Sequence, residues 1–285
     1  MPNNPSQQAV ELLKSFETGD RKSAAYINPD NYTQHNLAIA DGLAGHTAVF
    51  QALPKGSARV NTIRVFQDSD YVFLHTEYNF ISTKIASHKI LRPKILGPQI
   101  VGPKIVGQKI FDGPKIGFDI FRFEDGKAVE HWDNLQQTPS APSPGGHTMI
   151  DGPTAATDLD KTESNKALMQ SYMDDLLAGR RDKFPDYFDG INYIQHNPWV
   201  ADNLTGLING LQDLAKRGKA VRYERVHKIL GEGNFVLVIS EGTFGDKLTA
   251  FYDLYRIHNG KIAEHWDTLE TIPPSSEWKN PNGKF

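Results

Sequence analysis

The chain repeats itself, and this repeat constrains the fold more than any other feature of the sequence. Tyr-Thr-Gln-His-Asn at residues 32–36 is matched by Tyr-Ile-Gln-His-Asn at residues 193–197. A longer segment at residues 117–133, which ends in Glu-His-Trp-Asp, is matched at residues 251–267. Because each copy is long enough for a domain of ordinary size, we expect two related domains in tandem and not a solenoid of short repeats.

The spacing of matched residues indicates that only the first copy carries an insertion. His35 and His196 are 161 positions apart, whereas Trp132 and Trp266 are 134 positions apart. The offset changes after Phe80, so the extra residues fall at 81–111. The expected organisation is a first domain at 1–138 with its insertion at 81–111, a linker at 139–160, a second domain at 161–273 and a tail at 274–285.

Each copy reads as helices followed by strands. Apolar residues at helical spacing come first, and four segments with strand-like composition follow. Asp125-Gly126 and Asn259-Gly260 predict tight hairpin turns, because both residues of each pair tolerate positive φ. This order predicts an α+β fold in which helices pack on a curved antiparallel sheet. The expected strands are 58–66, 71–80, 117–123 and 128–133 in the first copy, and 222–230, 235–244, 249–257 and 262–269 in the second.

Composition excludes several classes of function. The formal net charge of −3 gives no bias toward nucleic acid, so no nucleic-acid partner is expected. There is no cysteine, which removes disulfides, thiolate metal sites and cysteine nucleophiles. No apolar run approaches the roughly 20 residues of a membrane span, and the first residues lack the features of a signal peptide. A cytoplasmic location is therefore the expectation.

The insertion at 81–111 has a repeat of its own. Isoleucine recurs every five residues, at positions 85, 90, 95, 100, 105 and 110. A period of five suits neither a helix nor a flat strand, and Pro93, Pro98 and Pro103 remove amide donors. We expect a long loop. The alternatives are a basic arm or pocket lid that contacts an acidic partner, and self-association through exposed isoleucine and valine.

The repeated motifs resemble a known family. Tyr-x-Gln-His-Asn followed by the hairpin ending in Glu-His-Trp-Asp is similar to the SnoaL-like branch of the nuclear transport factor 2-like superfamily, described as predicted aldol-condensing polyketide cyclases. The resemblance covers 1–138 and 161–273 and leaves out the insertion. It implies two cone-shaped domains, each a curved antiparallel sheet around a pocket closed by helices. The superfamily includes cyclases, isomerases, epoxide hydrolases and non-catalytic binders, so the resemblance leaves the reaction open.

The resemblance implies an acid/base role for one aspartate in each copy. Asp119 and Asp253 match the aspartate that serves as acid/base in the family's cyclases. A carboxylate in an apolar pocket has a raised pKa, so it could remove a proton alpha to a carbonyl and return it elsewhere. The alternative is a structural aspartate that pairs with a nearby arginine or caps a strand end.

The shorter motif matches a pocket-facing segment of the family. His35 and His196 are catalytic candidates, because a neutral imidazole could hold a developing enolate oxygen. The alternative is a buried histidine bonded to backbone. The substrate-binding candidates from this motif are Tyr32, Asn36, Tyr193 and Asn197.

The His-Trp-Asp triplets at 131–133 and 265–267 lie on a predicted strand. Side chains alternate on a strand, so His and Asp share one face and Trp takes the other. With a plain two-residue turn, Asp119 pairs with Trp132; a one-residue bulge places His131 beside Asp119 instead. We favour the tryptophans as pocket wall. The substrate-binding candidates from this motif are His131, Trp132, His265 and Trp266.

Three hypotheses for function follow. The first is a cofactor-independent enzyme, an aldol-type cyclase or isomerase, acting on a small apolar or aromatic carbonyl compound; the second is a binding module without chemistry. The third is an assembly protein that uses the basic insertion. No metal site is expected, although His35, His131 and Asp119 together are a conceivable ligand set. The two copies carry different residues at some matched positions. This favours either two unequal pockets or an internal pseudo-dimer in which one half serves only as a scaffold. Homo-oligomers are the alternative.

Overall fold

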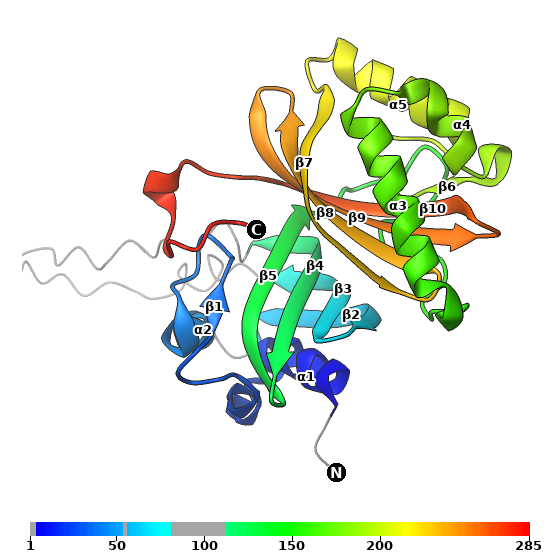
Figure 1. Cartoon of the computed structure of the whole chain (residues 1–285). Helices are drawn as coiled ribbons and strands as arrows, with labels where there is room; N and C mark the ends of the chain where they lie inside the picture. The colour runs from blue at the N-terminus through cyan, green and yellow to red at the C-terminus, as the bar shows by residue number, and fades with distance from the viewer. Residues whose placement is uncertain (1–3, 54–55, 81–111) are drawn as a thin grey trace, which may run out of the picture.

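The computed structural model describes residues 4–53, 56–80 and 112–285, so the predictions for 81–111 lie outside the described residues. The elements of the first half are α1 (Pro5–Thr18), η1 (Arg21–Tyr26), β1 (Thr33–Gln34), α2 (Gly42–Ala52), β2 (Ala58–Asp68), β3 (Tyr71–Phe80), β4 (Gly113–Glu124) and β5 (Lys127–Gln137). Figure 1 shows α1 and α2 on one side of this sheet and the second half of the chain on the other.

The second half repeats this arrangement. Its elements are η3 (Leu159–Lys161), α3 (Thr162–Leu177), η4 (Arg181–Lys183), α4 (Phe184–Tyr187), η5 (Gly190–Asn192), β6 (Ile194–Gln195), α5 (Asn203–Lys216), β7 (Val221–Glu232), β8 (Phe235–Phe244), β9 (Lys247–His258), β10 (Lys261–Thr271) and η6 (Ser275–Glu277). Within the described residues, no helix is long and apolar enough to cross a membrane.

The two sheets have the same topology. Their strand orders are β1-β5-β4-β3-β2 and β6-β10-β9-β8-β7, and the short first strand of each pairs in parallel with the last. The other neighbours are antiparallel hairpins. The predicted α+β fold of two tandem domains, each a curved sheet with packed helices, is therefore confirmed. The predicted strands at 71–80 and 235–244 coincide with β3 and β8.

Alternation along the strands gives each sheet two apolar faces. On β9, Tyr252 and Leu254 belong to a core shared by both domains, whereas Tyr255 and Ile257 pack against the helices of the second domain. Successive side chains on a strand point to opposite faces, which explains the separation. Each domain therefore has a helix face, where a pocket can form, and a face toward the other domain.

The final hairpins decide which side chains reach the helix face. Asp125 and Gly126 both have positive φ, 48° and 74°, as the predicted two-residue turn requires. The pairing then shifts by one residue between Arg122 and Phe123, so that Asp119 lies opposite Asp133. This is the bulged alternative. It places His131 on the same face as Asp119 and sends Trp132 to the other face.

The interface between the domains is apolar with a few buried polar contacts. Phe66 stacks on Phe235 with ring centroids 4.6 Å apart, and both belong to the shared core. Buried Asn134 donates through Nδ2 to the carbonyl of Thr268 at 2.7 Å. β5 and β10 meet here, so the two sheets pack against each other within one chain.

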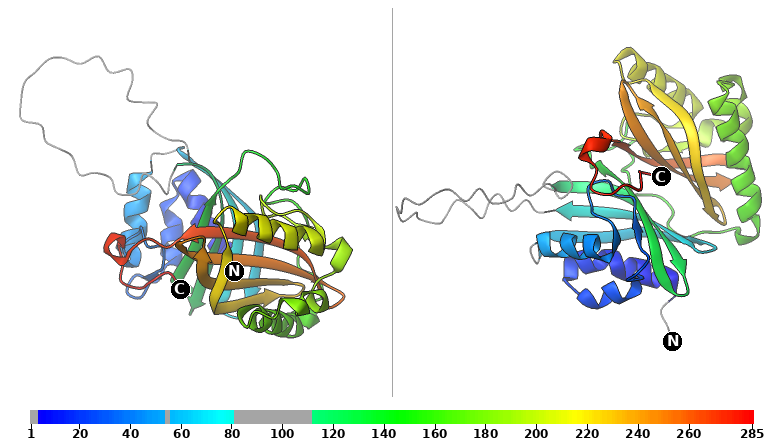
Figure 2. Two further views of the ribbon diagram at one scale, coloured as in Figure 1. Left: turned by 90° about the horizontal axis from the view of Figure 1, so that it is seen from above. Right: turned by 60° about the vertical axis from the view of Figure 1, so that its left-hand side comes forward.

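Each domain is also held by the segment that follows the other domain's last strand. The carbonyl of Thr148, after β5, lies 2.7 Å from Nδ1 of His196 in the second domain. The carbonyl of Gly283, after β10, lies 3.0 Å from Nδ1 of His35 in the first domain. Figure 2 shows the red C-terminal segment crossing to the blue first domain. The segment after β5 and the segment after β10 each pack on the domain to which they do not belong in sequence. The expected domain limits therefore remain a prediction.

Candidate functional site

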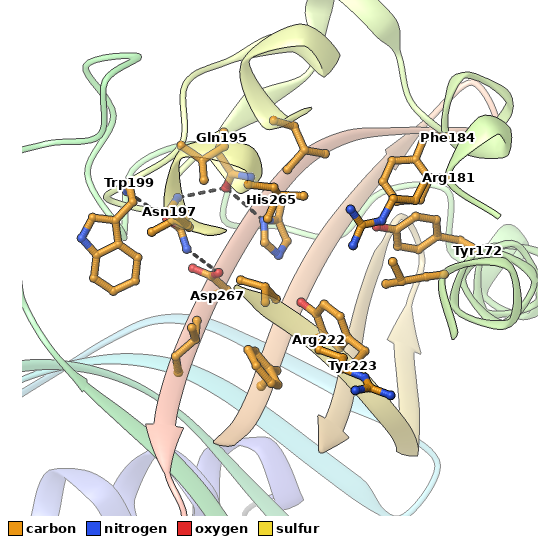
Figure 3. Close-up of a pocket in the computed structure, with 18 of the residues that line it drawn as sticks. Tyr172, Arg181, Phe184, Gln195, Asn197, Trp199, Arg222, Tyr223, His265 and Asp267 are labelled. Carbon is orange, nitrogen blue, oxygen red and sulfur yellow. Dashed lines mark hydrogen bonds between the residues drawn. The ribbon is translucent and has the colours of Figure 1, made fainter. Parts of the chain in front are cut away.

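The second domain contains a cavity of about 430 Å³ between its helices and its sheet. Most of its wall is apolar and comes from α3, α4, α5 and β9. The principal apolar side chains of the wall are Leu176, Phe184, Val200, Leu207, Leu211 and Phe251. A few polar groups interrupt this wall, as is usual for sites that bind small molecules. Figure 3 shows them.

The polar groups come from two strands that lie side by side. Gln195 on β6 pairs with His265 on β10, and both line the cavity. Asn197 and Asp267 lie two positions further along the chain and line it as well. Alternation explains the set, since residues two apart share a face. The predicted substrate-binding residues Asn197 and His265 are therefore brought together, and Tyr193 also lines the cavity.

His265 lies in a continuous hydrogen-bonded chain. Its Nδ1 is 3.0 Å from Oε1 of Gln195, which also accepts the backbone N–H of Asn197. An oxygen fixed in this way accepts from His265, so its Nδ1 carries a proton. Its Nε2 lies 2.9 Å from Oδ1 of Asp253. Burial lowers the pKa of His265, but the bond to Asp253 and the charges of Asp267 and Asp253 outweigh it, and the pKa is raised.

Asp267 is the carboxylate that faces the cavity. Its Oδ2 accepts a hydrogen bond from Nδ2 of Asn197 at 2.6 Å, whereas its buried Oδ1 has no hydrogen-bond partner among the described residues. Burial, reinforced by the charge of Asp253, raises the pKa of Asp267 to about 6. A carboxylate with a free oxygen and a pKa near neutrality can take a proton from a ligand and return it.

Asp253 lies behind this surface. It is fully buried and is not among the residues that line the cavity. Its two oxygens accept from the hydroxyl of Tyr223 at 3.1 and 3.2 Å, in addition to the contact with His265. Burial and the nearby charge of Asp253 raise the pKa of Tyr223, so the phenol stays neutral. Asp253 is thus placed to orient His265 and Tyr223, both of which line the cavity.

Two arginines give the cavity a positive side. In Figure 3, Arg181 and Arg222 lie on the side of the cavity away from Asn197 and Asp267. Arg181 is exposed and makes no ion pair within the described part of the chain. The side chain of Arg222 is 77% exposed, and its nearest carboxylate is 3.8 Å away on Glu224. Their charge is therefore largely free to attract an anion.

The first domain repeats the polar arrangement around a much smaller cavity of about 60 Å³. Asp119 accepts from the hydroxyl of Tyr78 at 2.5 Å and lies 3.3 Å from Nε2 of His131. Asn36 donates to Asp133 at 2.6 Å. The predicted residues that line this cavity are Tyr32, Asn36, Asp119 and His131.

Aromatic side chains fill the first cavity. Tyr78, on β3, reaches in to bond Asp119, whereas the equivalent position on β8 is Gly242. His46 from α2 packs against Phe16, with ring centroids 5.4 Å apart, and both line the cavity. Burial lowers the pKa of His46 to about 4, so the imidazole is neutral. The second domain therefore offers the larger site for a ligand.

The tail adds a further difference between the copies. Lys284 is buried, with its Nζ 2.6 Å from Glu270 and 3.7 Å from Oδ1 of Asp133. Burial lowers the pKa of Lys284, but the charges of Glu270 and Asp133 outweigh it, and the pKa is raised. Asp133 therefore has a buried cation beside it, whereas Asp267 has no lysine or arginine within ion-pair distance among the described residues.

His35 and His196 lie away from both cavities, which corrects their expected catalytic position. Each follows a cavity-facing glutamine by one residue and so points to the opposite face of its sheet. Nε2 of His196 lies 2.8 Å from Glu264, and Nε2 of His35 lies 2.9 Å from Glu130. Both histidines are buried and hold the segment that arrives from the other domain.

Trp132 and Trp266 are not pocket wall, contrary to the sequence interpretation. Both belong to the core between the domains. His35 stacks on Trp132 and His196 stacks on Trp266, with ring centroids 4.7 and 4.5 Å apart. The bulge in each final hairpin is the physical reason, because it assigns the tryptophan to the interdomain face.

Three clusters in the described part of the chain place possible metal-ligating atoms within 4.8 Å of one another. The members of these clusters are Asp119, His131 and Asp133; Asp253, His265 and Asp267; and His147, Asp151 and His196. The conceivable set of His35, His131 and Asp119 is not among them, since His35 points to the opposite face of the sheet.

Sequence reasoning missed Asp267, Tyr223 and Arg181 as site residues. A signal for Asp267 was present, because it follows His265 by two positions on a strand and must share its face. Tyr223 carried no such signal. The tyrosine that bonds the buried aspartate comes from β3 in the first domain and from β7 in the second, so the repeat does not align the two.

No family model and no curated protein matches the chain. Solved structures do match, each over about half of it. IdmH of Streptomyces antibioticus, a candidate polyketide cyclase, is 18% identical over 47% of this chain and 93% of its own, with a TM-score of 0.32. TsrD of Streptomyces laurentii is 19% identical over 47% and 90%, with a TM-score of 0.31.

A third match is an epoxide hydrolase from M. tuberculosis, 15% identical over 47% of this chain and 86% of its own, with a TM-score of 0.30. Likeness at this level carries no argument about activity, which has to come from the site itself.

Proposed function

We propose that the protein is a small-molecule enzyme of the acid/base type whose active site is the cavity of the second domain. The observation that carries this proposal is Asp267, a buried carboxylate with one free oxygen, a pKa of about 6 and an apolar cavity in front of it. Most buried polar atoms have hydrogen-bond partners, so an unpartnered carboxylate oxygen beside a cavity points to a ligand. Oδ1 of Asp133 also lacks a hydrogen-bond partner, but the Lys284 cation lies 3.7 Å from it. The first domain would serve as the scaffold half of the pseudo-dimer.

The proposed chemistry is proton transfer next to a carbonyl group. Oδ1 of Asp267 would remove a proton alpha to the carbonyl and return it at another carbon or oxygen, as in an isomerisation or an aldol-type ring closure. The protonated His265, whose nitrogen lies within 4.8 Å of an Asp267 oxygen, would stabilise the negative charge that develops. Asp253 would keep His265 protonated and Tyr223 in place.

The proposed substrate is an apolar carbonyl compound that also carries an anionic group. The middle of the cavity is apolar, which suits a hydrocarbon or aromatic body. Arg181 and Arg222 lie opposite Asp267, where an anionic end would place the carbonyl end near the carboxylate. A screen should therefore pair carbonyl acids with their methyl esters, and we expect the acids to bind more tightly.

Replacing the proposed base tests the reaction. Asp267→Asn keeps an oxygen that can accept from Asn197 but cannot take the substrate proton, so turnover is expected to fall by about 10²- to 10⁴-fold with a small change in KM. In the wild type, kcat/KM should rise with pH through about 6, as Asp267 ionises. Steady-state kinetics on a substrate found in the screen measures both.

The first domain provides the matched control. Asp133→Asn makes the same change at the equivalent residue beside the small cavity, and we expect turnover to stay within about twofold of the wild type. Equal losses in both variants would show that the two domains share the chemistry. Undiminished turnover in Asp267→Asn would refute the proposed base and leave the binding hypothesis, which predicts that ligands are retained and no product forms.

A further inference from the structure

We propose that the linker and the second domain together form a site for one divalent transition-metal ion, with His147, Asp151 and His196 as its ligands. The cluster lies on the interdomain side of the sheet, not in the cavity, because His196 points away from the cavity-facing Gln195 and Asn197. The proposal is independent of the catalytic one. The ion would have a structural role, because it would hold the linker against the second domain.

One candidate ligand atom from each of the three residues lies within 4.8 Å of the other two. Nδ1 of His196 lies 2.8 Å from Oδ1 of Asp151, and Nδ1 of His147 lies 3.5 Å from Oδ2 of the same carboxylate. The carbonyl of Thr148 is 2.7 Å from Nδ1 of His196. Ligands bound at about 2.0–2.2 Å to zinc lie roughly 3–4 Å from one another, so little rearrangement is needed.

Both histidines have the outer partners that metal-binding histidines use. The nitrogen of each ring that would not bind the ion faces a carboxylate: Nε2 of His196 lies 2.8 Å from Glu264, and Nε2 of His147 lies 3.3 Å from Asp202. Such carboxylates fix the tautomer and leave the Nδ1 lone pair for the metal. Glu264 is held in turn by Nε of Arg256 at 2.6 Å.

The surroundings of His196 also point to a cation. Its Nδ1 faces two acceptors, a carbonyl and a carboxylate, and its Nε2 faces a third. A metal ion at Nδ1 would satisfy the first two at once. The side chains of His147 and Asp151 are 30% and 45% exposed, so the ion could enter from solvent. Two imidazoles, a carboxylate and a carbonyl suit Zn²⁺, Co²⁺ or Ni²⁺ better than Ca²⁺ or Mg²⁺.

The first domain shows what the same position looks like without these ligands. His35 is equivalent to His196, and its two ring nitrogens likewise face a carboxylate, that of Glu130, and a carbonyl, that of Gly283. The tail there reads Asn-Pro-Asn-Gly-Lys at 280–284 and supplies neither a histidine nor a carboxylate. The proposed site therefore belongs to the linker side alone, and one ion per chain is expected.

Metal binding to the full-length protein tests the proposal. After treatment with a chelator, titration with Co²⁺ should give one equivalent with visible absorption bands of a nitrogen- and oxygen-coordinated ion, and Zn²⁺ should displace it. The unfolding midpoint should rise with Zn²⁺ concentration, because the ion binds the folded state. His147→Ala and Asp151→Asn should each weaken Co²⁺ binding by at least about tenfold. Circular dichroism without metal checks that both variants fold.

Two controls separate this site from others. His258→Ala removes an exposed histidine of β9 and should leave Co²⁺ affinity unchanged. Asp267→Asn, in the cavity cluster, should leave it unchanged too. Binding that is equal in the wild type and His147→Ala, or that disappears in Asp267→Asn and persists in His147→Ala, would overturn the proposal, as would the absence of binding to the wild type.

Discussion

Two aspartates in the same motif have different electrostatic neighbours. Asp133 and Asp267 both follow His-Trp and both accept from an asparagine at 2.6 Å. Oδ1 of each aspartate has no hydrogen-bond partner among the described residues, but Lys284 lies 3.7 Å from Oδ1 of Asp133, whereas no lysine or arginine lies within ion-pair distance of Asp267 in that part of the chain. A cation stabilises the charged form of a carboxylate and burial destabilises it, so equal motifs can have unequal chemistry.

The raised pKa of Asp267 predicts a pH-dependent effect on stability. Its pKa goes from an ordinary 3.8 to about 6 on folding, so its contribution favours the folded state below pH 4 and is lost as pH rises through 6. Asp267→Asn, which cannot ionise, should therefore gain stability relative to the wild type by about 2 kcal/mol between pH 4 and pH 8. Urea unfolding at both pH values measures this; a difference independent of pH would contradict it.

At the scale of elements, a single bulge decides which residues face the cavity. The shift between Ile262 and Glu264 puts His265 and Asp267 on the helix face of β10 and Trp266 on the other. Without the bulge the pairing with β9 would move by one residue, and every side chain beyond it would change face relative to its neighbours. The final hairpin is thus the element that builds the site.

Gly242 keeps β7 and β8 close together beside the cavity. A Cβ at this position would lie 1.9 Å from the backbone oxygen of Arg222, so Gly242→Ala should push β7 away at a cost of about 1–3 kcal/mol. Tyr223 lies opposite Gly242 and should lose its bond to Asp253. The urea midpoint measures the cost, with Thr243→Ala as the control; equal midpoints for the two variants would argue against the close approach.

At the scale of the whole molecule, the domains are fastened by exchanged segments as well as by their shared core. Residues after β5 pack on the second domain and residues after β10 pack on the first. Asn280 donates to the carbonyls of Asn36 and Ile39, and Phe285 stacks on His227 of the second domain with ring centroids 3.9 Å apart. The tail therefore bridges both domains, and their unfolding should be coupled.

Lys284 is the tail residue whose replacement we expect to destabilise the protein most. Lys284→Met leaves the buried carboxylate of Asp133 without its cation, at a cost of about 3 kcal/mol. The double variant Asp133→Asn/Lys284→Met should recover part of the lost stability, because it leaves no unpaired buried charge. Thermal unfolding of both variants measures the effect, and Lys279→Met, an exposed lysine of the same tail, is the control. If Lys284→Met lowered the unfolding temperature no more than Lys279→Met, Lys284 would contribute little to the stability of the interface.

Local signals in the chain predicted much of the fold. The turns at 125–126 and 259–260, the strands at 71–80 and 235–244 and the α+β order follow from spacing and turn chemistry, which act over a few residues. The candidate site was predicted in part. Asn197 and His265 were nominated and line the cavity, but His196 and Trp266 belong to the face between the domains.

The sequence by itself determined that two copies of one domain exist, in which order their elements run and which polar residues recur. Tertiary structure decided which copy has room for a ligand. Tyr78 lines the small first cavity, whereas the equivalent residue Gly242 brings no side chain to the larger second cavity. Lys284 arrives beside Asp133 from a segment 151 positions away along the chain. A motif fixes the residues near one another in sequence, whereas a pocket depends on side chains that only folding brings together.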